Sequence, residues 1–461
     1  MTYSRTLADY AARLNYEDLS PEVVASTRLR LLDTVGVCLA SVGMEYAEAI
    51  LAMLDEQGSS TDATLFGSAK RTSAAWAACY NGALAHGNDY DDTHSVALMH
   101  ISGVVMPTVL ALGERHRLPG RRVLEAAVAG YEAGLRIGMA TPSGFHARGF
   151  HATGVCGVFA AAIAAARLLG LDAARMTHAI GIAGSQAAGS MEFLADGAWT
   201  KRLHPGWAAH AGIVAAQLAA RGYTGPATAL EGRYGLYNAY AGVPEPDLAR
   251  HTATFGTEWE TLNIDFKPYP CGHANHPYMD CARALVERHR FTIADIEAIE
   301  LRVPPAFVPI LCEPFAKKIR PASAYAARFS LPYAVAVILK LGRAGIDEFS
   351  TERIADPDLI TLMARTRYVA DATLPFPQTF PGWVKIRLKD GREFEERMDA
   401  SRGSRELPMS ETAMYEKFAA NAARAMPAER VRAVWDAGMA VERMDDVRAF
   451  TGLLSRRSDA V

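Results

Sequence analysis

The 461-residue chain is poor in the features that mark secreted, membrane-spanning or disulfide-stabilised proteins. Its six cysteines are scattered without a CxxC pair, which argues against a disulfide framework and against an iron–sulfur cluster held by cysteines. The first residues contain no apolar h-region, so we expect no secretory signal. The longest apolar run, 154–166, is rich in alanine and too short to cross a bilayer. These absences favour a location in the reducing cytoplasm, away from membranes.

Charge and sequence motifs exclude further classes of function. With 48 basic and 51 acidic residues, the net charge of −3 gives no reason to expect a nucleic acid or an anionic membrane as partner. The chain has no GxGxxG opening a βαβ unit, no GxxxxGK[ST], no GxSxG and no HExxH. We therefore expect no cofactor, and expect the protein's own side chains to perform its chemistry.

Sequence patterns predict a mainly α fold with two domains. One helical domain is expected from residues 1–265 and 405–461, where Ala-rich stretches are closed by glycine and Ser20-Pro21 provides a helix start. A smaller α+β lid domain is expected from residues 266–404. There the segments IEAIELRVP and WVKIRLKDGREFEERM alternate as half-buried strands, the second turning at Asp390-Gly391.

The densest group of chemically active side chains lies between two predicted apolar helices. A block of carboxylates and imidazoles in such a place is costly to desolvate, and chains tolerate that cost most readily where the groups do chemistry. The alternative is a polar loop whose aspartates cap helices and whose histidines lie on the surface. The residues of this 86–100 cluster are His86, Asp89, Asp91, Asp92, Thr93, His94 and His100.

Two further segments of the helical part carry candidate residues. His146 and His151 lie in a Gly-rich loop before an Ala-rich helix, whose N-terminus would favour an anionic group, although solvated loop histidines are an alternative. Lys201 and Arg202 precede a helix expected to start near Pro205. Lys201 could bind a carboxylate or act as an acid, whereas Arg202 is interpreted as an ordinary surface residue.

Two segments of the predicted lid domain complete the set. FKPYPCGHANHP, residues 266–277, lies on the predicted domain boundary, where ligand sites are common, and contains Lys267 and His276. A metal site there is disfavoured because zinc needs a second ligand pair at suitable spacing. The segment 319–335 offers Arg320 as a binding residue and Tyr333 as a proton donor, with two packed tyrosines as the alternative.

This inventory suits proton abstraction next to a carboxylate, with cations holding the substrate. Histidine is the side chain that most easily supplies a base near pH 7. A local His/Lys/Arg pocket in a slightly acidic protein would select a small polyanion.

Together the five segments resemble the MmgE/PrpD family of 2-methylcitrate dehydratase-like proteins. The matching pieces follow the family's order and rough spacing: NGALAHGNDYDDTH, GFHATGVCGVFAAA, LADGAWTKRLHPGWAAHAG, KPYPCGHANHP and ARFSLPYAVA. The resemblance implies an all-helical domain built from both chain ends, a smaller α+β lid domain and a homodimer. It also implies metal-free enzymes of small di- and tricarboxylates, among them 2-methylcitrate dehydratase, cis-aconitate decarboxylase and iminodisuccinate epimerase.

The resemblance further implies a set of pocket residues. His151 and His276 would be the base and the acid in either order, Lys201 and Thr93 would hold carboxylates, and Asp89 would orient an imidazole. The remaining catalytic candidates are His100 and Tyr333; the remaining substrate-binding candidates are His94, Lys267 and Arg320. Relatives close to the dehydratase or the decarboxylase tend to have Trp after DDT and His-Pro-Ser further on, where this chain has His94 and His100-Ile101-Ser102.

The sequence therefore predicts a cofactor-independent lyase or isomerase, with 2-methylcitrate dehydration slightly preferred to epimerisation or decarboxylation. A metal-dependent hydrolase that uses the 86–100 cluster is an alternative. A non-catalytic protein that retains an old fold is another, although the matched pocket residues argue against it.

Overall fold

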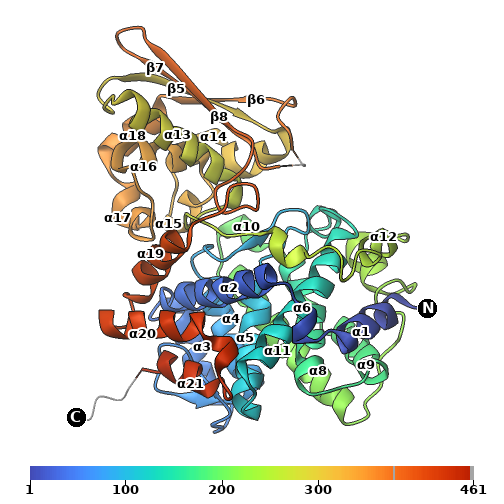
Figure 1. Ribbon diagram of the computed structural model, residues 1–461. Coiled ribbons are helices and arrows are strands. Elements are labelled where there is room, and N and C mark those ends of the chain that lie inside the picture. The colour runs from blue at the N-terminus through green and yellow to red at the C-terminus, as the bar shows by residue number, and fades with distance from the viewer. Residues whose placement is uncertain (377–378, 457–461) are drawn as a thin grey trace. The chain divides into compact units, whose positions relative to one another are not determined.

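The structure is a computed structural model that describes residues 1–376 and 379–456 (Figure 1). The chain divides into two compact units, each described by itself below. Unit 1 comprises 1–87, 91–264 and the C-terminal part from Ser410. Unit 2 comprises Asn88–Tyr90 and Asp265–Met409. Helices dominate the described chain, so the predicted mainly α fold with a smaller α+β part is confirmed.

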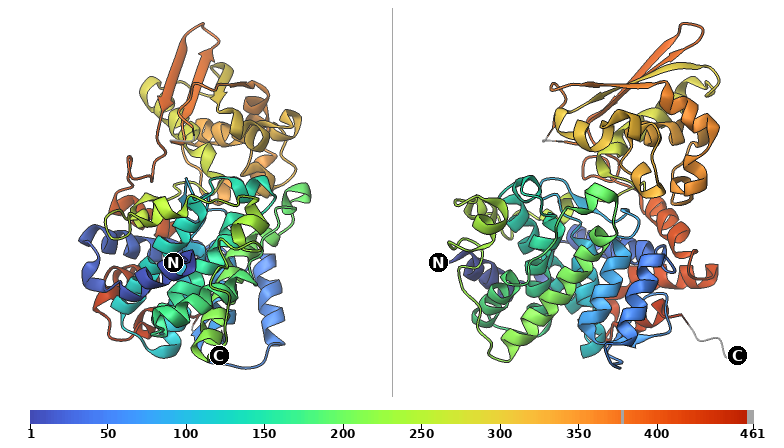
Figure 2. Two further views of the ribbon diagram at one scale, coloured as in Figure 1. Left: turned by 90° about the vertical axis from the view of Figure 1, so that its right-hand side faces the viewer. Right: turned by 180° about the vertical axis from the view of Figure 1, so that it is seen from behind.

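Unit 1 is a bundle of helices with only short strands, as Figures 1 and 2 both show. Within the described residues, no helix is both long and apolar enough to cross a membrane. The helices are α1 (Tyr3–Arg13), α2 (Pro21–Leu39), α3 (Glu45–Asp55), α4 (Ala74–Ala85), α5 (Ser102–His116), α6 (Gly120–Met139), α7 (Gly144–Ala147), α8 (Ala152–Leu168), α9 (Ala173–Gly184), α10 (Phe193–Asp196), α11 (Thr200–Ala220), α12 (Leu248–Thr252), α19 (Glu411–Ala422), α20 (Ala428–Met439) and α21 (Arg448–Thr451). The strands are β1 (Ala63–Thr64), β2 (Arg71–Thr72) and β3 (Thr93–His94).

The core of unit 1 is built around α8, which is buried along its whole length. Helices α5, α6, α9 and α11 pack on it. Its small residues allow close approach: a Cβ at Gly134 of α6 would lie only 2.5 Å from the Cβ of Ala160. Glycine at this position therefore lets α6 and α8 approach closely.

Local contacts explain where α2 begins and how the C-terminal segment is attached to it. The hydroxyl of Ser20 accepts a hydrogen bond from the backbone N–H of Val23, and Pro21 is the first residue of α2, as predicted. The C-terminal segment is tied to α2 by a buried ion pair between Lys417 Nζ and Asp33 Oδ1, 2.7 Å apart.

One helix start was predicted wrongly. Helix α11 begins at Thr200, five residues before the expected start near Pro205, and the proline lies inside it. A proline removes one N–H from the helix ladder but still fits its φ angle. The apolar face of α11, buried against α8, compensates for that lost bond. Lys201 and Arg202 therefore lie in the first turn of the helix.

Unit 2 contains a four-stranded sheet in the order β6-β5-β7-β8. The strands are β5 (Ile296–Val303), β6 (Thr366–Ala370), β7 (Gly382–Leu388) and β8 (Glu393–Met398); the helices are α13 (His276–His289), α14 (Phe315–Lys318), α15 (Ala324–Ala327), α16 (Leu331–Leu341), α17 (Thr351–Ile354) and α18 (Pro357–Ala364). Strand β5 is parallel to β6 and antiparallel to β7. Helix α13 packs against β7 and β8, and α16 packs against α13.

The predicted alternation of the strands is confirmed. Ile299 pairs with Ile386 and Leu301 with Val384, and all four side chains are fully buried. The hairpin between β7 and β8 turns at Asp390-Gly391, where Gly391 has φ +90°, as its sequence predicted.

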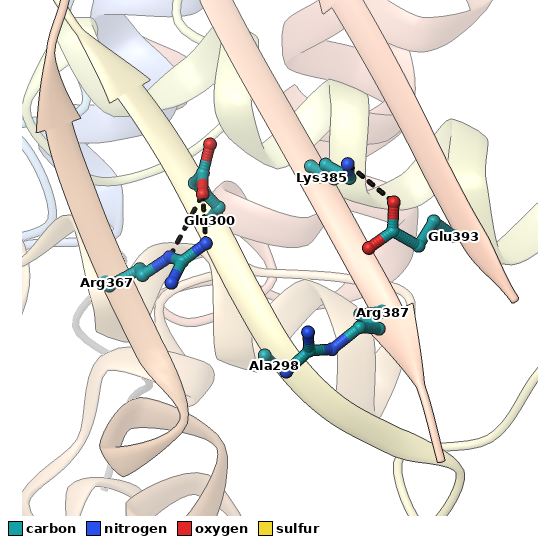
Figure 3. Close-up of a pocket in the computed structure, with 6 residues that line it drawn as sticks. All are labelled: Ala298, Glu300, Arg367, Lys385, Arg387 and Glu393. Carbon is teal, nitrogen blue, oxygen red and sulfur yellow. Dashed lines mark hydrogen bonds and ion pairs between the residues drawn. The ribbon is translucent and has the colours of Figure 1, made fainter. Parts of the chain in front are cut away.

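The opposite face of the sheet carries charges that neutralise one another (Figure 3). Arg367 bonds Glu300, and Lys385 Nζ lies 2.6 Å from Glu393 Oε2, across a shallow depression that Ala298 and Arg387 also line. Exposed pairs of this kind contribute little to stability.

Candidate functional site

In unit 1, a close helix crossing brings the end of α4 to the start of α11. A Cβ at Gly82 of α4 would lie 2.7 Å from the Cα of Gly206 of α11, so both positions require glycine. Four residues after Gly82, His86 caps the C-terminus of α4. The guanidinium of Arg202 donates to the carbonyl of Gly87 over 3.0 Å, which fixes the first turn of α11 beside this loop. Arg202 thereby has a structural role.

His86 is held by a carboxylate. Its Nδ1 lies 2.8 Å from Oδ2 and 2.9 Å from Oδ1 of Asp91, and both side chains are almost completely buried. A buried carboxylate hydrogen-bonded to one ring nitrogen fixes both the orientation and the tautomer of an imidazole. Asp91 thus orients the ring of His86.

His100 lies beside His86, with ring centroids 4.7 Å apart. Its Nδ1 is 2.9 Å from the backbone carbonyl oxygen of Asp92 and 3.1 Å from the hydroxyl of Thr93. Its backbone N–H donates to the hydroxyl of Thr153 in α8. Thr93 and His100, two of the predicted site residues, are therefore in contact and anchored to the central helix.

His151 is the N-cap residue of α8 and is buried, with its ring centroid 5.6 Å from that of His86. Its Nδ1 is 3.1 Å from Nδ1 of His204 in α11. His86, His100 and His151, which we call the histidine triad, each offer a ring nitrogen within 4.8 Å of the others. Side chains that are 65 residues apart in sequence thus meet in one buried place.

Burial and nearby positive charge keep His151, His204 and His146 neutral near pH 7. The pKa of His151 lies well below its ordinary value, first because of burial and then because of Lys201, His86 and the other rings nearby. Burial, together with Lys201, also lowers the pKa of His204 and of His146 to about 4. A neutral imidazole can accept a proton, and it can also bind the protonated acid form of an anionic substrate. Lys201 is itself buried in the first turn of α11.

Two other members of the 86–100 cluster have structural roles. Asp92 caps α5 by accepting from the backbone N–H and the hydroxyl of Ser102, and it pairs with the buried Arg30. His94 uses both ring nitrogens: Nε2 lies 3.1 Å from Glu260 Oε2, and Nδ1 accepts from the backbone N–H of Ala97. The helix-capping alternative thus describes Asp92 well, and His94 is buried rather than on the surface.

Unit 2 carries a second polar cluster, built on Asn88–Tyr90. Lys267 Nζ donates to the backbone carbonyl of Asp89 over 2.9 Å and lies 3.5 Å from its carboxylate. Arg328 donates to the carbonyl and side-chain oxygens of Asn88 and to the carbonyl of Pro270. Within unit 2, the carboxylate of Asp89 is therefore paired with a lysine.

His276 begins α13 and is fully buried. Its Nε2 is 3.3 Å from the carbonyl oxygen of Cys271, and its ring centroid is 5.2 Å from that of His273. Burial lowers the pKa of His273 to about 3 and keeps the pKa of His276 well below its ordinary value. Both rings are neutral near pH 7.

Tyr333 and Arg320 lie in settings that do not by themselves indicate a site. The hydroxyl of Tyr333 donates to the backbone carbonyl of Glu348, and burial raises its pKa, so it is a poor acid. Arg320 is exposed. The six cysteines, all in the described part of the chain, are free and buried, and none joins the groups there whose geometry would suit a metal ion.

The sequence did not predict the roles of three residues of unit 1. His86 and Asp91 were noted as members of the cluster but not assigned roles, and His204 was not singled out. The pairing of His86 with Asp91 has a spacing of five residues that no helical or strand period predicts. His204 lies one turn after Lys201 on α11, a signal that a correctly placed helix start would have provided.

The buried His, Lys and Asp side chains of this site are candidates for proton transfer. The chain belongs to the MmgE/PrpD family: the MmgE/PrpD N-terminal domain matches residues 5–249 and the C-terminal domain matches 269–441. It is 28% identical to the cis-aconitate decarboxylase of Mus musculus, over 96% of this chain and 91% of that protein. The cis-aconitate decarboxylase of Homo sapiens is also 28% identical, over 95% and 91% of the two chains. The cis-aconitate decarboxylase-like protein oryM of Aspergillus oryzae is 26% identical over 97% and 96%.

The predicted family is thus confirmed, and the protein is an enzyme of the lyase type. The names of these relatives support the decarboxylase alternative, and do not support the slight preference for 2-methylcitrate dehydration.

Proposed function

We propose that this lyase decarboxylates a small unsaturated tricarboxylate of the cis-aconitate class. The observation that carries the proposal is that cis-aconitate decarboxylases match the chain over nearly its entire length, rather than over one domain. The buried histidines and lysine of unit 1 supply groups that such a reaction needs.

The reaction needs an anion-binding group and a proton. As CO2 leaves the methylene carbon, the electron pair of the broken carbon–carbon bond forms a new terminal double bond. The pair of the old double bond then takes a proton at the carbon beside a remaining carboxylate. One proton is consumed for each CO2 released. We assign carboxylate binding to Lys201 and Thr93, and the N-terminus of α8 adds favourable partial positive charge beside His151.

We assign proton delivery to His100 or His151. In the free enzyme the depressed pKa keeps His151 neutral. Negative charge close to a histidine raises its pKa, so a bound tricarboxylate would draw a proton onto the cluster. Protonation would thus accompany substrate binding, and the proton would be present when the carbanion forms. The roles of Asp89, Lys267, His276, Tyr333 and Arg320 stay predictions from sequence.

The test is proton NMR of the metal-stripped enzyme in D2O with cis-aconitate, 2-methylcitrate, citrate and iminodisuccinate in separate samples. We expect CO2 loss from cis-aconitate, with one deuterium incorporated beside a carboxylate of the product. His151→Ala is the variant that should abolish it, and His116→Ala, a change at an exposed residue of α5, is the control. Loss of water from 2-methylcitrate without any decarboxylation would contradict the proposal.

We also propose that the protein is a homodimer. Trp199, the N-cap residue of α11, and Leu203 and Trp207 within the helix are spaced four residues apart and are 47%, 38% and 38% exposed. Exposed apolar stripes of this kind mark interaction surfaces, and this one lies on the helix that carries Lys201. Light scattering should give twice the chain mass of 49.8 kDa, and Trp207→Glu should shift it towards one chain mass. A monomeric wild-type protein would contradict this proposal.

A further inference from the structure

Three imidazoles of unit 1 form an arrangement that suits a metal ion. The ligand atoms of the histidine triad lie within 4.8 Å of one another, and all three residues belong to the same compact unit. They come from the C-cap of α4, the loop before α5 and the N-cap of α8. Neutral imidazole is a preferred ligand of Zn2+ and of neighbouring divalent transition metals.

Each ring of the triad is also held from behind at its Nδ1 atom. His86 bonds the carboxylate of Asp91, His100 lies beside the carbonyl oxygen of Asp92, and His151 lies beside Nδ1 of His204. Histidines that bind metals almost always bond a carboxylate or carbonyl through the other ring nitrogen. A ring held at Nδ1 presents Nε2 as its ligand atom. These contacts orient the three rings, and for His86 and His100 the contact is the carboxylate or carbonyl oxygen that metal-binding histidines usually bond.

We propose that His86, His100 and His151 together bind one divalent transition metal ion of the Zn2+ class, and that the bound ion inhibits the enzyme. Three nitrogen ligands leave one tetrahedral position for water or a substrate carboxylate. Lys201 opposes the ion's charge and Asp91 favours it. The ion would occupy the lone pairs of His100 and His151, so neither ring could carry a proton. The inhibition, unlike the binding, rests on the proposed decarboxylation.

Metal binding can be measured without any activity. The chelator-treated protein is titrated with Co2+, and the visible absorption of a tetrahedral site is recorded. We expect one equivalent to bind wild type and His116→Ala, and His86→Ala to lose the band. Asp91→Asn should weaken affinity about 10- to 100-fold, the usual effect of removing a carboxylate that is hydrogen-bonded to a metal-binding histidine. Thermal melting of each variant shows that loss of binding is not loss of folding.

Several results would overturn the site. Wild type could bind no Co2+, or His86→Ala, folded as judged by melting, could bind it as tightly as His116→Ala does. If His86→Ala does not fold, the comparison of Asp91→Asn with His116→Ala decides, and equal affinities overturn the proposal.

Inhibition is a separate measurement. The rate of decarboxylation is followed with increasing Zn2+, each variant being compared with its own metal-free rate. We expect loss of activity at one bound equivalent, and a higher inhibiting concentration for Asp91→Asn. Full activity with the site occupied would overturn the inhibition. Absence of turnover with every acid would instead refute the decarboxylation, while the Co2+ titration still decides the site.

Discussion

Two clusters of buried charge, the histidines around Lys201 in unit 1 and the cations around Asn88–Tyr90 in unit 2, have different kinds of partner. In unit 1, imidazoles face one another, and burial followed by the charge of Lys201 lowers the pKa of His151. In unit 2, Lys267 and Arg328 are bonded to backbone carbonyls of Asn88–Tyr90 and its neighbours. Buried cations that satisfy carbonyl oxygens hold a fold together. The contrast teaches that burial of a charged residue does not by itself mark a reactive group; its partners do.

The largest expected effect comes from removing reactive groups of unit 1. His151→Ala and Lys201→Ala should each lower kcat/KM at least ~100-fold, the usual scale for losing one acid–base or anion-stabilising group. Melting temperatures should stay near that of wild type, so that the loss of rate is not a loss of folding. Steady-state kinetics and melting curves check both statements. Activity like that of wild type in either variant would remove that residue from the mechanism.

Removing a cation of unit 2 should act on stability instead. Arg328→Ala leaves the buried carbonyls of Asn88 and Pro270 without their donor, which should cost about 3 kcal/mol of unfolding free energy. Denaturant unfolding measures this. The matched control is Arg367→Ala, at an exposed arginine of the same unit. If both variants were equally stable, the structural role of Arg328 would be refuted.

The pH dependence of the unfolding free energy tests the burial of His273 in unit 2. The pKa of His273 falls to about 3 in the folded protein because it is buried, whereas the unfolded chain binds a proton near pH 6.5. The unfolded state thus holds more protons between about pH 3 and 6.5, so stability rises with pH through that window and is complete above it. Wild type should be about 2 kcal/mol less stable at pH 5 than at pH 8 from this residue alone.

His273→Gln removes that contribution. The difference in unfolding free energy between pH 5 and pH 8 should shrink, whatever the variant's absolute stability. His289→Gln, outside the buried cluster, is the control. An unchanged difference in His273→Gln would show that this ring does not carry the acid sensitivity.

The smallest effect is expected on the charged face of the sheet. Glu300→Gln breaks an exposed pair with Arg367, and should change the unfolding free energy by less than about 1 kcal/mol and leave turnover unaltered. Unfolding and kinetic assays check this. A large loss of activity would show that the depression of Figure 3 takes part in function.

Local features of the fold could be predicted from sequence because they depend on neighbours in the chain. The cap at Ser20 and the alternation of Ile299 and Leu301 follow from rules with periods of a few residues. The start of α11 could not, because the burial of its apolar face outweighed the usual preference of proline for the first turn.

The sequence could predict which types of residue form the candidate site, but not which of them contact one another. Imidazoles and a lysine near an acidic cluster could be recognised along the chain. That His151 would meet His204 depends on how α8 and α11 pack, and that Asp89 would pair with Lys267 depends on which unit holds Asn88–Tyr90. Both are tertiary facts, without a local period to reveal them.

The placement of Asn88–Tyr90 has a consequence for how such a chain can be cut or recombined. The backbone passes between the units at 87/88, 90/91, 264/265 and 409/410. Unit 2 is therefore formed by two separate segments, Asn88–Tyr90 and Asp265–Met409. A fragment comprising only 265–409 would lack the carbonyl of Asp89 that Lys267 binds and the Asn88 oxygens that Arg328 binds, and Arg328 would keep its bond to the carbonyl of Pro270. The smaller unit is therefore not a transferable module: a recombination event that moved it would also have to move a tripeptide encoded far upstream.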